Sequence, residues 1–284
     1  MQALYAHEQE YWVRELAWDA SVTWHDIEQG RTAGELPGLL VCDADGVNRG
    51  WAYFVRDGKT VHLGTLVADT IEATTALADA YLESAMQPPR PEYVSCFLPL
   101  RARGLEAVLV DRGFACEPYH YLTRSLTRGS GETGADAWRE ADLLPAARLL
   151  RESYGHQARH FAPHGTLEEW EHYLHSLVEL PGCGVTEPTM TRVVRGHDRL
   201  DALVFCTRIA PSTLHLAQVA VHPSRQRHGL AHTLVDEACR AAASRGIELA
   251  TLLVGDSNTV ARRLYAKSGF LEQAQFLAAM RRVA

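Results

Sequence analysis

The stretch from Val219 to Ala231 constrains the fold of this chain more than any other. An apolar run from Leu214 to Val221 suits a buried strand, and Pro223 ends it because proline cannot donate a backbone hydrogen bond to a sheet. After a short basic segment, Gly229 precedes an amphipathic helix. Its apolar residues recur at helical spacing, at Leu230, Leu234, Val235, Ala238 and Ala242. The stretch therefore predicts a strand, a short basic turn and the N-terminus of a helix.

Such a turn suits a phosphate group. The first turn of a helix offers unpaired N–H groups and the positive end of the helix dipole. Gly229 and Ala231 leave space for a ligand, and Arg225 and Arg227 add positive charge. The alternative is an ordinary strand-to-helix turn that contains a glycine.

Two segments carry a resemblance to a known family. The Q-x-x-G-x-A pattern of Gln226, Gly229 and Ala231, preceded by V-x-P at Val221 and Pro223, resembles the acyl-CoA pyrophosphate loop of GNAT superfamily acetyltransferases. The resemblance covers residues 139 to 284.

The second segment lies downstream. An apolar strand from Glu248 to Val254 is followed by G-D-S-N-T-V-A-R-R-L-Y-A-K-S-G-F, which is similar to the second signature of the family. The matching positions are Asn258, Ala261, Tyr265, Gly269 and Phe270. Since both segments follow strands and stand in the family's order, the resemblance implies an acetyl-CoA-dependent N-acetyltransferase that uses direct transfer.

The resemblance also implies which residues form the acyl-CoA site. The strand would offer backbone groups to the pantetheine arm, although the side chains of Val219 and Val221 also suit a core, and Asn258 could either cap its helix or contact that arm. The residues expected at this site are Val219, Ala220, Val221, Arg225, Gln226, Arg227, His228, Gly229, Leu230, Ala231, Asn258, Arg262 and Tyr265.

Three residues are candidates for the chemistry. An amine must lose a proton and a thiolate must be protonated or stabilised, which calls for a base and a weak acid. In the family a tyrosine at the position of Tyr265 approaches the sulfur of CoA, and the alternative is a core tyrosine. The predicted strand carries no carboxylate, so His215 is the candidate base, with a surface histidine as the alternative. Gln218 could hold a water.

The segment 154 to 164 lies between two predicted helices, where the family lines its acceptor site. His156, His160 and His164 have the i, i+4 spacing of helical metal ligands. Pro163 interrupts that helix and no H-E-x-x-H is present, so we predict no metal site. An acceptor-binding loop and a solvated loop both remain open.

The N-terminal half repeats the same order of predicted elements. The segment 108 to 114 mirrors 264 to 270, but after the strand that ends at Ala68 come Asp69 and Glu72, without glycine or arginine. Acidic residues at a helix N-terminus repel a pyrophosphate. We therefore predict two domains, a degenerate one over 1–127 without an acyl-CoA loop and a catalytic one over 138–284, joined by a glycine-rich linker at 127 to 137.

The composition of the chain argues against several classes of partner and location. The net charge of −7 argues against nucleic acid. The six cysteines are widely spaced, which is typical of reduced residues in a cytoplasmic protein. No apolar run approaches the length that crosses a membrane, and no signal peptide is recognisable.

The sequence thus predicts an α/β (α+β) fold of two tandem GNAT-like units, each a mixed, mostly antiparallel twisted sheet flanked by helices. The predicted function is transfer of an acetyl group from acetyl-CoA to an amine of a small molecule, in a ternary complex. A non-catalytic acyl-CoA-binding module and an acetyltransferase of protein lysines or N-termini are the alternatives.

Overall fold

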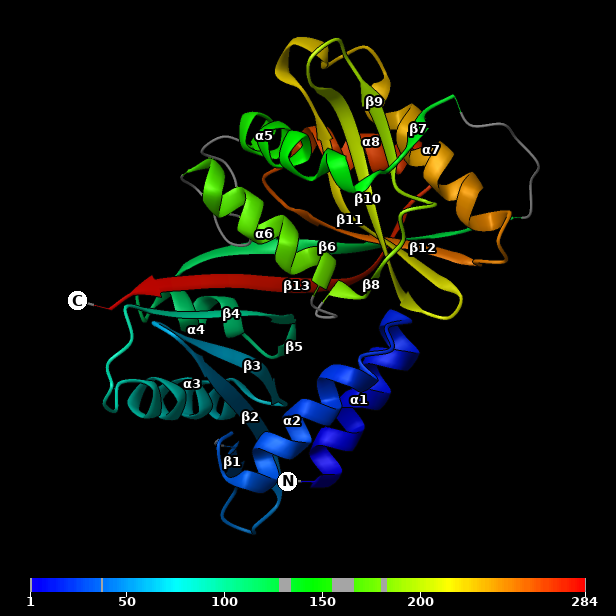
Figure 1. The fold of residues 1–284 in the computed structure, drawn as a ribbon. Coiled ribbons are helices and arrows are strands. Elements are labelled where there is room, and N and C mark those ends of the chain that lie inside the picture. The colour runs from blue at the N-terminus through cyan, green and yellow to red at the C-terminus, as the bar shows by residue number, and fades with distance from the viewer. Residues whose placement is uncertain (1, 37, 128–133, 155–165, 180–182, 284) are drawn as a thin grey trace.

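The computed structural model describes residues 2–36, 38–127, 134–154, 166–179 and 183–283. Within these ranges the strands form one continuous, mixed 13-stranded sheet with helices on both faces (Figure 1). The predicted class, two tandem units that are each a mixed, mostly antiparallel sheet flanked by helices, is confirmed. No helix in these ranges is long and apolar enough to cross a membrane.

Helices and strands follow a similar order in the two halves of the chain. In the N-terminal half they are α1 (Gln2–Leu16), α2 (Ser21–Ala33), β1 (Gly38–Cys42), β2 (Asn48–Asp57), β3 (Thr60–Ala68), α3 (Ile71–Ala85), β4 (Tyr93–Pro99), β5 (Arg101–Ala102), α4 (Leu105–Val110) and β6 (Ala115–Ser125). In the C-terminal half they are β7 (Asp136–Ala137), a 3-10 turn (Glu140–Asp142), α5 (Leu143–Tyr154), α6 (Leu167–Glu179), β8 (Val185–Thr186), β9 (Arg192–Arg195), β10 (Leu200–Ala210), β11 (Thr213–Val221), a 3-10 turn (Pro223–Arg225), α7 (Leu230–Ala243), β12 (Leu249–Gly255), α8 (Thr259–Lys267) and β13 (Leu271–Arg282).

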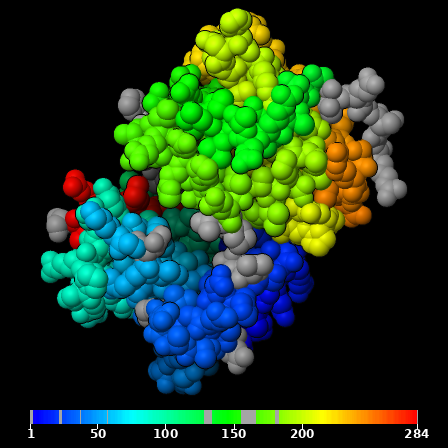
Figure 2. Space-filling view, in the orientation of Figure 1, coloured from blue at the N-terminus to red at the C-terminus, as the bar shows by residue number. Residues whose placement is uncertain are grey.

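The two halves exchange their last long strands. The sheet order is β1-β2-β3-β4-β13-β6-β12-β11-β10-β9-β7. Thus β13 pairs with β4 of the N-terminal half, and β6 pairs with β12 of the C-terminal half. Figure 1 shows β6 and β13 side by side across the middle of the molecule. In the space-filling view the end of β13 lies against the N-terminal lobe (Figure 2). The predicted division of the chain therefore separates chain segments, while the sheet runs through both.

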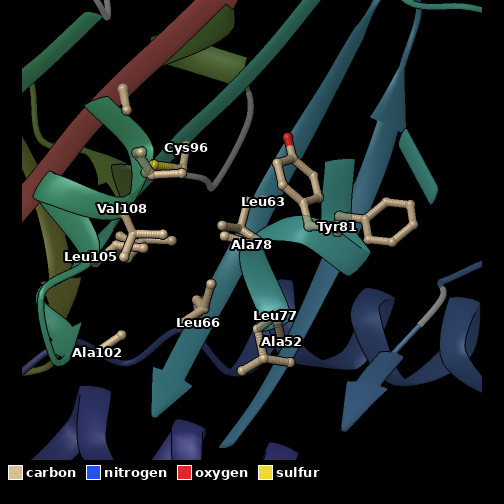
Figure 3. Packing of buried hydrophobic residues seen from close by; sticks show 14 of the residues in the cluster. Ala52, Leu63, Leu66, Leu77, Ala78, Tyr81, Cys96, Ala102, Leu105 and Val108 are labelled. Atoms are coloured by element: carbon tan, nitrogen blue, oxygen red, sulfur yellow. The ribbon is translucent and has the colours of Figure 1, made fainter. Parts of the chain in front are cut away.

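Helices cover the two faces of the sheet in the same way in each half. One face, called here the first face, is covered by α1 and α2 in the N-terminal half and by α5 and α6 in the C-terminal half. The second face is covered by α3 and α4, and by α7 and α8. Figure 3 shows the second-face core of the N-terminal half, where Tyr81 of α3 packs near Leu63 and Cys96. The Tyr81 hydroxyl also donates to the Val61 carbonyl, 2.8 Å away.

The repeat extends to a local irregularity of the sheet. Beside β2 the register of β3 skips Gly64, and beside β10 the register of β11 skips Ala217. Each is the fifth residue of a nine-residue strand. A bulge of this kind moves the side chains beyond it to the other face. In β11 it brings Gln218 and Ala220 to the first face, whereas Leu216 packs on the second.

The end of the predicted linker is part of the sheet. Asp136 and Ala137 form β7 beside β9, and the N–H groups of Gly134 and Ala135 donate to the carboxylate of Glu237 at 3.0 and 2.9 Å. Polar, glycine-rich composition gave no sign of this pairing, because its partners lie about 60 to 100 residues away in the chain.

Candidate active site

A gap in strand pairing forms the centre of the candidate site. The parallel strands β11 and β12 pair only from Thr213 to His215, and beyond that point they diverge. The Val219 carbonyl accepts a hydrogen bond from Tyr154 Oη at 3.1 Å, and the Val221 carbonyl accepts from Ser153 Oγ at 3.1 Å. Both donors come from the end of α5. Backbone groups of β11 therefore reach into the divergence, where they bond to side chains and not to a strand.

The turn after β11 has an unusual backbone. Arg227 has φ +64° and Gly229 has φ +79°, both in the left-handed region. A Cβ added to Gly229 would meet nothing within 4 Å, so glycine is favoured there by its backbone angle and not by lack of space. A positive φ at an arginine costs free energy, of the kind that is often found at functional sites.

The helix that follows begins without a side-chain cap. The first backbone bond of α7 runs from Thr233 N to the Gly229 carbonyl, and the residue at the cap position is glycine itself. The N–H groups of Leu230, Ala231 and His232 therefore precede the first helical bond, and they lie at the positive end of the helix dipole. Such a helix start can bind an anion.

The side chains of the turn are exposed, and most are held to the protein. Gln226 Nε2 donates to the Val221 carbonyl at 3.2 Å, and His228 Nδ1 donates to the Gln226 carbonyl at 2.7 Å. Arg225 pairs with Asp201 at 3.3 Å. Among the residues described, Arg227 makes no ion pair, so its positive charge is available to a ligand.

Tyr265 lies on α8, where the resemblance places it. The residue is 7% exposed, and its ring meets Phe270 edge to face at 6.0 Å. Burial, and next the nearby Tyr154, raise the pKa of Tyr265 well above that of a free phenol. At neutral pH the hydroxyl is therefore protonated and can donate a proton or a hydrogen bond.

Three further tyrosines are linked to Tyr265 through Tyr154, and sequence reasoning missed them. Tyr154 of α5 interacts electrostatically with Tyr265, with Tyr173 of α6 and with Tyr119 of β6. Burial raises the pKa of Tyr154 to about 12. Gln218 Nε2 donates to Tyr173 Oη at 2.5 Å. These four residues, called here the tyrosine cluster, come from four elements of both halves. No local sequence signal joins them.

His215 is buried against the first helix pair. Its Nδ1 hydrogen-bonds Thr251 Oγ1 at 2.9 Å, and its ring lies 5.1 Å from the ring of Trp18, between centroids. Burial lowers the pKa of His215 to about 4. The imidazole is therefore neutral at pH 7, inside the protein and not on the surface.

Two residues expected at the start of α8 have protein partners. The Asn258 side chain accepts from Ala261 N at 3.1 Å, and so caps the helix. Arg262 pairs with Asp256 at 2.5 Å, and Asp256 in turn meets His120 Nε2 at 2.9 Å. Of the two interpretations of Asn258, the structure contains the cap.

The histidines 156, 160 and 164 lie outside the described residues, so their arrangement remains a prediction. In the part of the chain that the structure describes, no group of three or more His, Cys, Asp and Glu residues could hold a metal ion. A capping box opens α6, because Thr166 N donates to Glu169 at 2.9 Å and Glu169 N donates to Thr166 at 3.3 Å.

The structure thus combines a diverging parallel strand pair, an uncapped glycine turn and a buried tyrosine. The fold of the chain matches GNAT folds. Residues 148–270 match the family described as "Acetyltransferase (GNAT) family". A comparison with curated proteins finds no match.

Solved structures share the fold across most of the chain. A GCN5-related N-acetyltransferase from Sphaerobacter thermophilus has a TM-score of 0.62 and 16% identity over 86% of this chain and 80% of its own. A tandem GNAT protein from the clavulanic acid biosynthesis pathway has a TM-score of 0.54 and 14% identity, over 87% and 82%. A glucosamine N-acetyltransferase region of a fungal multi-domain GH3 β-N-acetylglucosaminidase has a TM-score of 0.59 and 13% identity, over 98% and 37%.

Proposed function

We propose that this protein is an acetyl-CoA-dependent N-acetyltransferase that transfers the acetyl group to an amine of a small molecule. The transfer is direct, in a ternary complex and without a covalent enzyme intermediate. The observation that carries the proposal is the divergence of β11 from β12 beyond His215, which opens toward the uncapped start of α7.

The residues present suit acyl-CoA as the co-substrate. In the proposal the N–H groups at the start of α7, together with Arg225 and Arg227, bind the pyrophosphate. The backbone from Val219 to Val221 binds the pantetheine arm by exchanging the hydroxyl partners Ser153 and Tyr154 for ligand amides. Gly229 has no side chain, and this leaves room for the phosphates to approach the backbone. Gln226, His228, Leu230 and Ala231 complete the turn, and Asn258 and Arg262 lie at the start of the second helix.

Tyr265 acts on the leaving group in this proposal. As the amine nitrogen bonds to the acetyl carbon, the carbon–sulfur bond breaks and charge develops on sulfur. The phenol donates a hydrogen bond to that sulfur, so CoA leaves as a stabilised thiolate, and the phenol keeps its proton because burial raises its pKa. The proton that the amine loses goes to His215, whose imidazole is neutral, or to a water held by Gln218, and then to solvent.

We propose a small molecule as the acceptor. No residue of the described chain suggests a nucleic-acid surface, and the net charge of −7 disfavours one. A cytoplasmic location belongs to the same proposal and is supported by six free cysteines. A protein lysine or N-terminus as acceptor, and an acyl-CoA-binding module without turnover, are the competing functions.

Product analysis separates these functions. The enzyme is incubated with acetyl-CoA and a library of amines, amino acids and aminoglycosides, and products are identified by mass. We expect an increase of one acetyl group on a small amine. Modification of added peptides alone would favour the protein acetyltransferase, and CoA binding without any product would favour the binding module.

Calorimetric titration with acetyl-CoA tests the assignment of the site to the C-terminal half. We expect about one site per chain, because α7 begins with an uncapped glycine turn, whereas α3, the corresponding helix of the N-terminal half, is capped by Thr70. A stoichiometry near two would contradict the proposal that residues 1–127 form a degenerate domain.

A further inference from the structure

The exchanged strand β6 carries a carboxylate from the N-terminal half into the site of the C-terminal half. Tyr119 pairs with Gly255 at the end of β12, and Glu117 lies two residues before it on the same face. The strand lies between β13 and β12 in Figure 1. The backbone of the adjoining loop is fixed to it, because Asp256 N donates to the Pro118 carbonyl at 2.8 Å. The candidate site thus contains a carboxylate that β11 itself lacks.

Gly255 leaves room for this carboxylate. A Cβ at Gly255 would lie 2.6 Å from Glu117 Oε1 and 3.4 Å from the Tyr119 ring. The φ of Gly255 is not in the left-handed region, so the backbone does not require glycine there. The Ser257 hydroxyl donates to Glu117 Oε1 and orients it. The absent side chain at 255 therefore accommodates the Glu117 carboxylate.

Glu117 adjoins the tyrosine cluster. The pKa of Tyr119 is raised by burial first, and then by the charge of Glu117 and by Tyr154. Phe97 of β4 meets the Tyr119 ring edge to face at 5.6 Å. The first face at the end of β6 thus combines the negative charge of Glu117 with aromatic rings, next to Tyr154, which in turn interacts with Tyr265.

We propose that Glu117 and Tyr119 bind the ammonium group of the acceptor, and that the acceptor is a primary amine carried on an aromatic or apolar body. The proposal rests on the acetyltransferase function proposed above and assigns the acceptor site to both halves of the chain. The carboxylate accepts hydrogen bonds from the ammonium, and the phenol ring of Tyr119 attracts the cation through its face. Tyr154 and Tyr173 pack against the body of the amine.

The same chemistry excludes a class of acceptors. An α-amino acid carries a carboxylate next to its amine, which would lie beside Glu117. Like charges this close repel each other. Phenethylamine and phenylalanine differ only in that carboxylate, and 2-phenylethanol is a neutral analogue of phenethylamine. These three compounds are therefore the probes.

The test measures binding to the full chain with CoA present. By calorimetry we expect the wild type to bind phenethylamine at least tenfold more tightly than phenylalanine. Glu117→Gln should weaken the binding of phenethylamine about tenfold, or about 1.4 kcal/mol, and leave that of 2-phenylethanol unchanged, because the neutral amide is a weaker acceptor for the ammonium. Glu248→Gln is the matched control, since it removes the same charge at the opposite, exposed end of β12.

A second variant tests the geometry without removing charge. Gly255→Ala displaces the carboxylate and should also weaken phenethylamine, while Glu117→Asp should retain part of the affinity. Thermal unfolding of each variant verifies the fold. If the wild type binds CoA but not phenethylamine, or if Glu117→Gln binds it as the wild type does, the inference is wrong. If the wild type fails to bind CoA, the proposed function itself fails.

Discussion

The two halves of the sheet place the same residue types at the same positions and give them different surroundings. His62 of β3 pairs with Ser95 of β4 at 2.7 Å, and His215 of β11 pairs with Thr251 of β12 at 2.9 Å. Both pairs stand two residues before a bulge, where a parallel strand pair begins to diverge. The first histidine is exposed and the second is buried beneath Trp18. The repeat therefore sets the framework, and the covering helices set the chemistry.

The N-terminal half closes the divergence that the C-terminal half leaves open. β5 pairs with the end of β3, at Val67 and Ala68. Thr65, which follows the bulge as Gln218 does in β11, donates to Glu8 Oε1 at 3.1 Å. Glu8 is buried and is also paired with Arg101 of β5. An ion pair and a strand thus fill the place where the other half has its tyrosine cluster.

The helices that follow the two diverging strand pairs, α3 and α7, also differ at their N-termini. The start of α3 is capped by Thr70, which accepts from Ala73 N at 3.1 Å, and Glu72 lies in its first turn. The start of α7 has neither. Leu109 occupies in α4 the place of Tyr265 in α8, since each precedes a glycine with φ near +80° by four residues. A few residues at one edge decide whether the repeated framework can bind a ligand.

We expect the largest effect from a carboxylate at the start of α7. The N-terminal half has Glu72 at the start of α3, and the C-terminal half has no acidic residue at the corresponding place. We expect Gly229→Glu to weaken CoA binding more than 100-fold, because the charge repels the pyrophosphate at the helix start. The φ of +79° also strains any residue except glycine, so Gly229→Asn serves as control, since asparagine tolerates this region. Calorimetry on both folded variants separates charge from strain. Equal affinities in the two variants would refute the phosphate site.

The buried His215 of the C-terminal half should make the folded protein less stable in acid. The folded state disfavours protonated His215, whose pKa falls from 6.5 to about 4 through burial. As the pH falls below about 6.5 the unfolded chain takes up the proton first. Stability is therefore complete above pH 6.5 and decreases toward pH 4, by about 3 kcal/mol at about 1.4 kcal/mol per pKa unit.

Urea unfolding between pH 4 and 7 measures this effect. His215→Gln should remove that share of the acid loss, so its stability should fall less than that of the wild type toward pH 4. If the stability of His215→Gln depends on pH as that of the wild type does, protonation of the buried His215 does not destabilise the folded state.

Tyr265→Phe tests the residue that Leu109 replaces in the other half. The ring and its contact with Phe270 remain, and only the hydroxyl is lost. We expect turnover to fall about 100-fold with acetyl-CoA affinity nearly intact, because the hydroxyl acts as charge develops on sulfur. The rate must be measured where chemistry limits turnover. A rate near that of the wild type would assign Tyr265 to the core and favour His215 or a bound water as proton carrier.

Local sequence patterns were sufficient to predict the helices and strands. They were not sufficient to predict that β6 and β13 are exchanged between the halves of the sheet. The helical spacing from Leu230 to Ala242 and the proline and glycine boundaries predicted α7 to within a residue or two of its observed bounds. The pairing of β6 with β12 had no such signal, because β6 and β13 are both apolar strands after similar helices and either could pair with β4. Pairs of residues such as β5 and β7 are too short for any periodicity.

The residues of the candidate site also fall into two groups, those that the sequence could predict and those that it could not. The turn and Tyr265 lie in contiguous motifs and could be named from the sequence. Glu117 and Tyr119 belong to the other half, and Tyr173 reads as one more residue of an amphipathic helix. These side chains meet only because β6 crosses between the halves and α6 packs on the first face. Long-range packing of this kind leaves no trace in spacing.

The smallest effect concerns Thr70, the cap that distinguishes α3 from α7. Thr70→Ala removes the acceptor of the Ala73 N–H and should lower the free energy of unfolding by about 1 kcal/mol, as the loss of a helix N-cap usually does. It should not create a second CoA site, because Asp69 and Glu72 remain negative and Glu8 with Arg101 still fills the divergence. The measurement is made in the Gly229→Glu background, where any CoA bound would belong to the N-terminal half. Denaturant unfolding gives the stability change and calorimetry gives the binding. CoA binding that returns in the double variant would show that the cap alone had kept the N-terminal half from binding acyl-CoA.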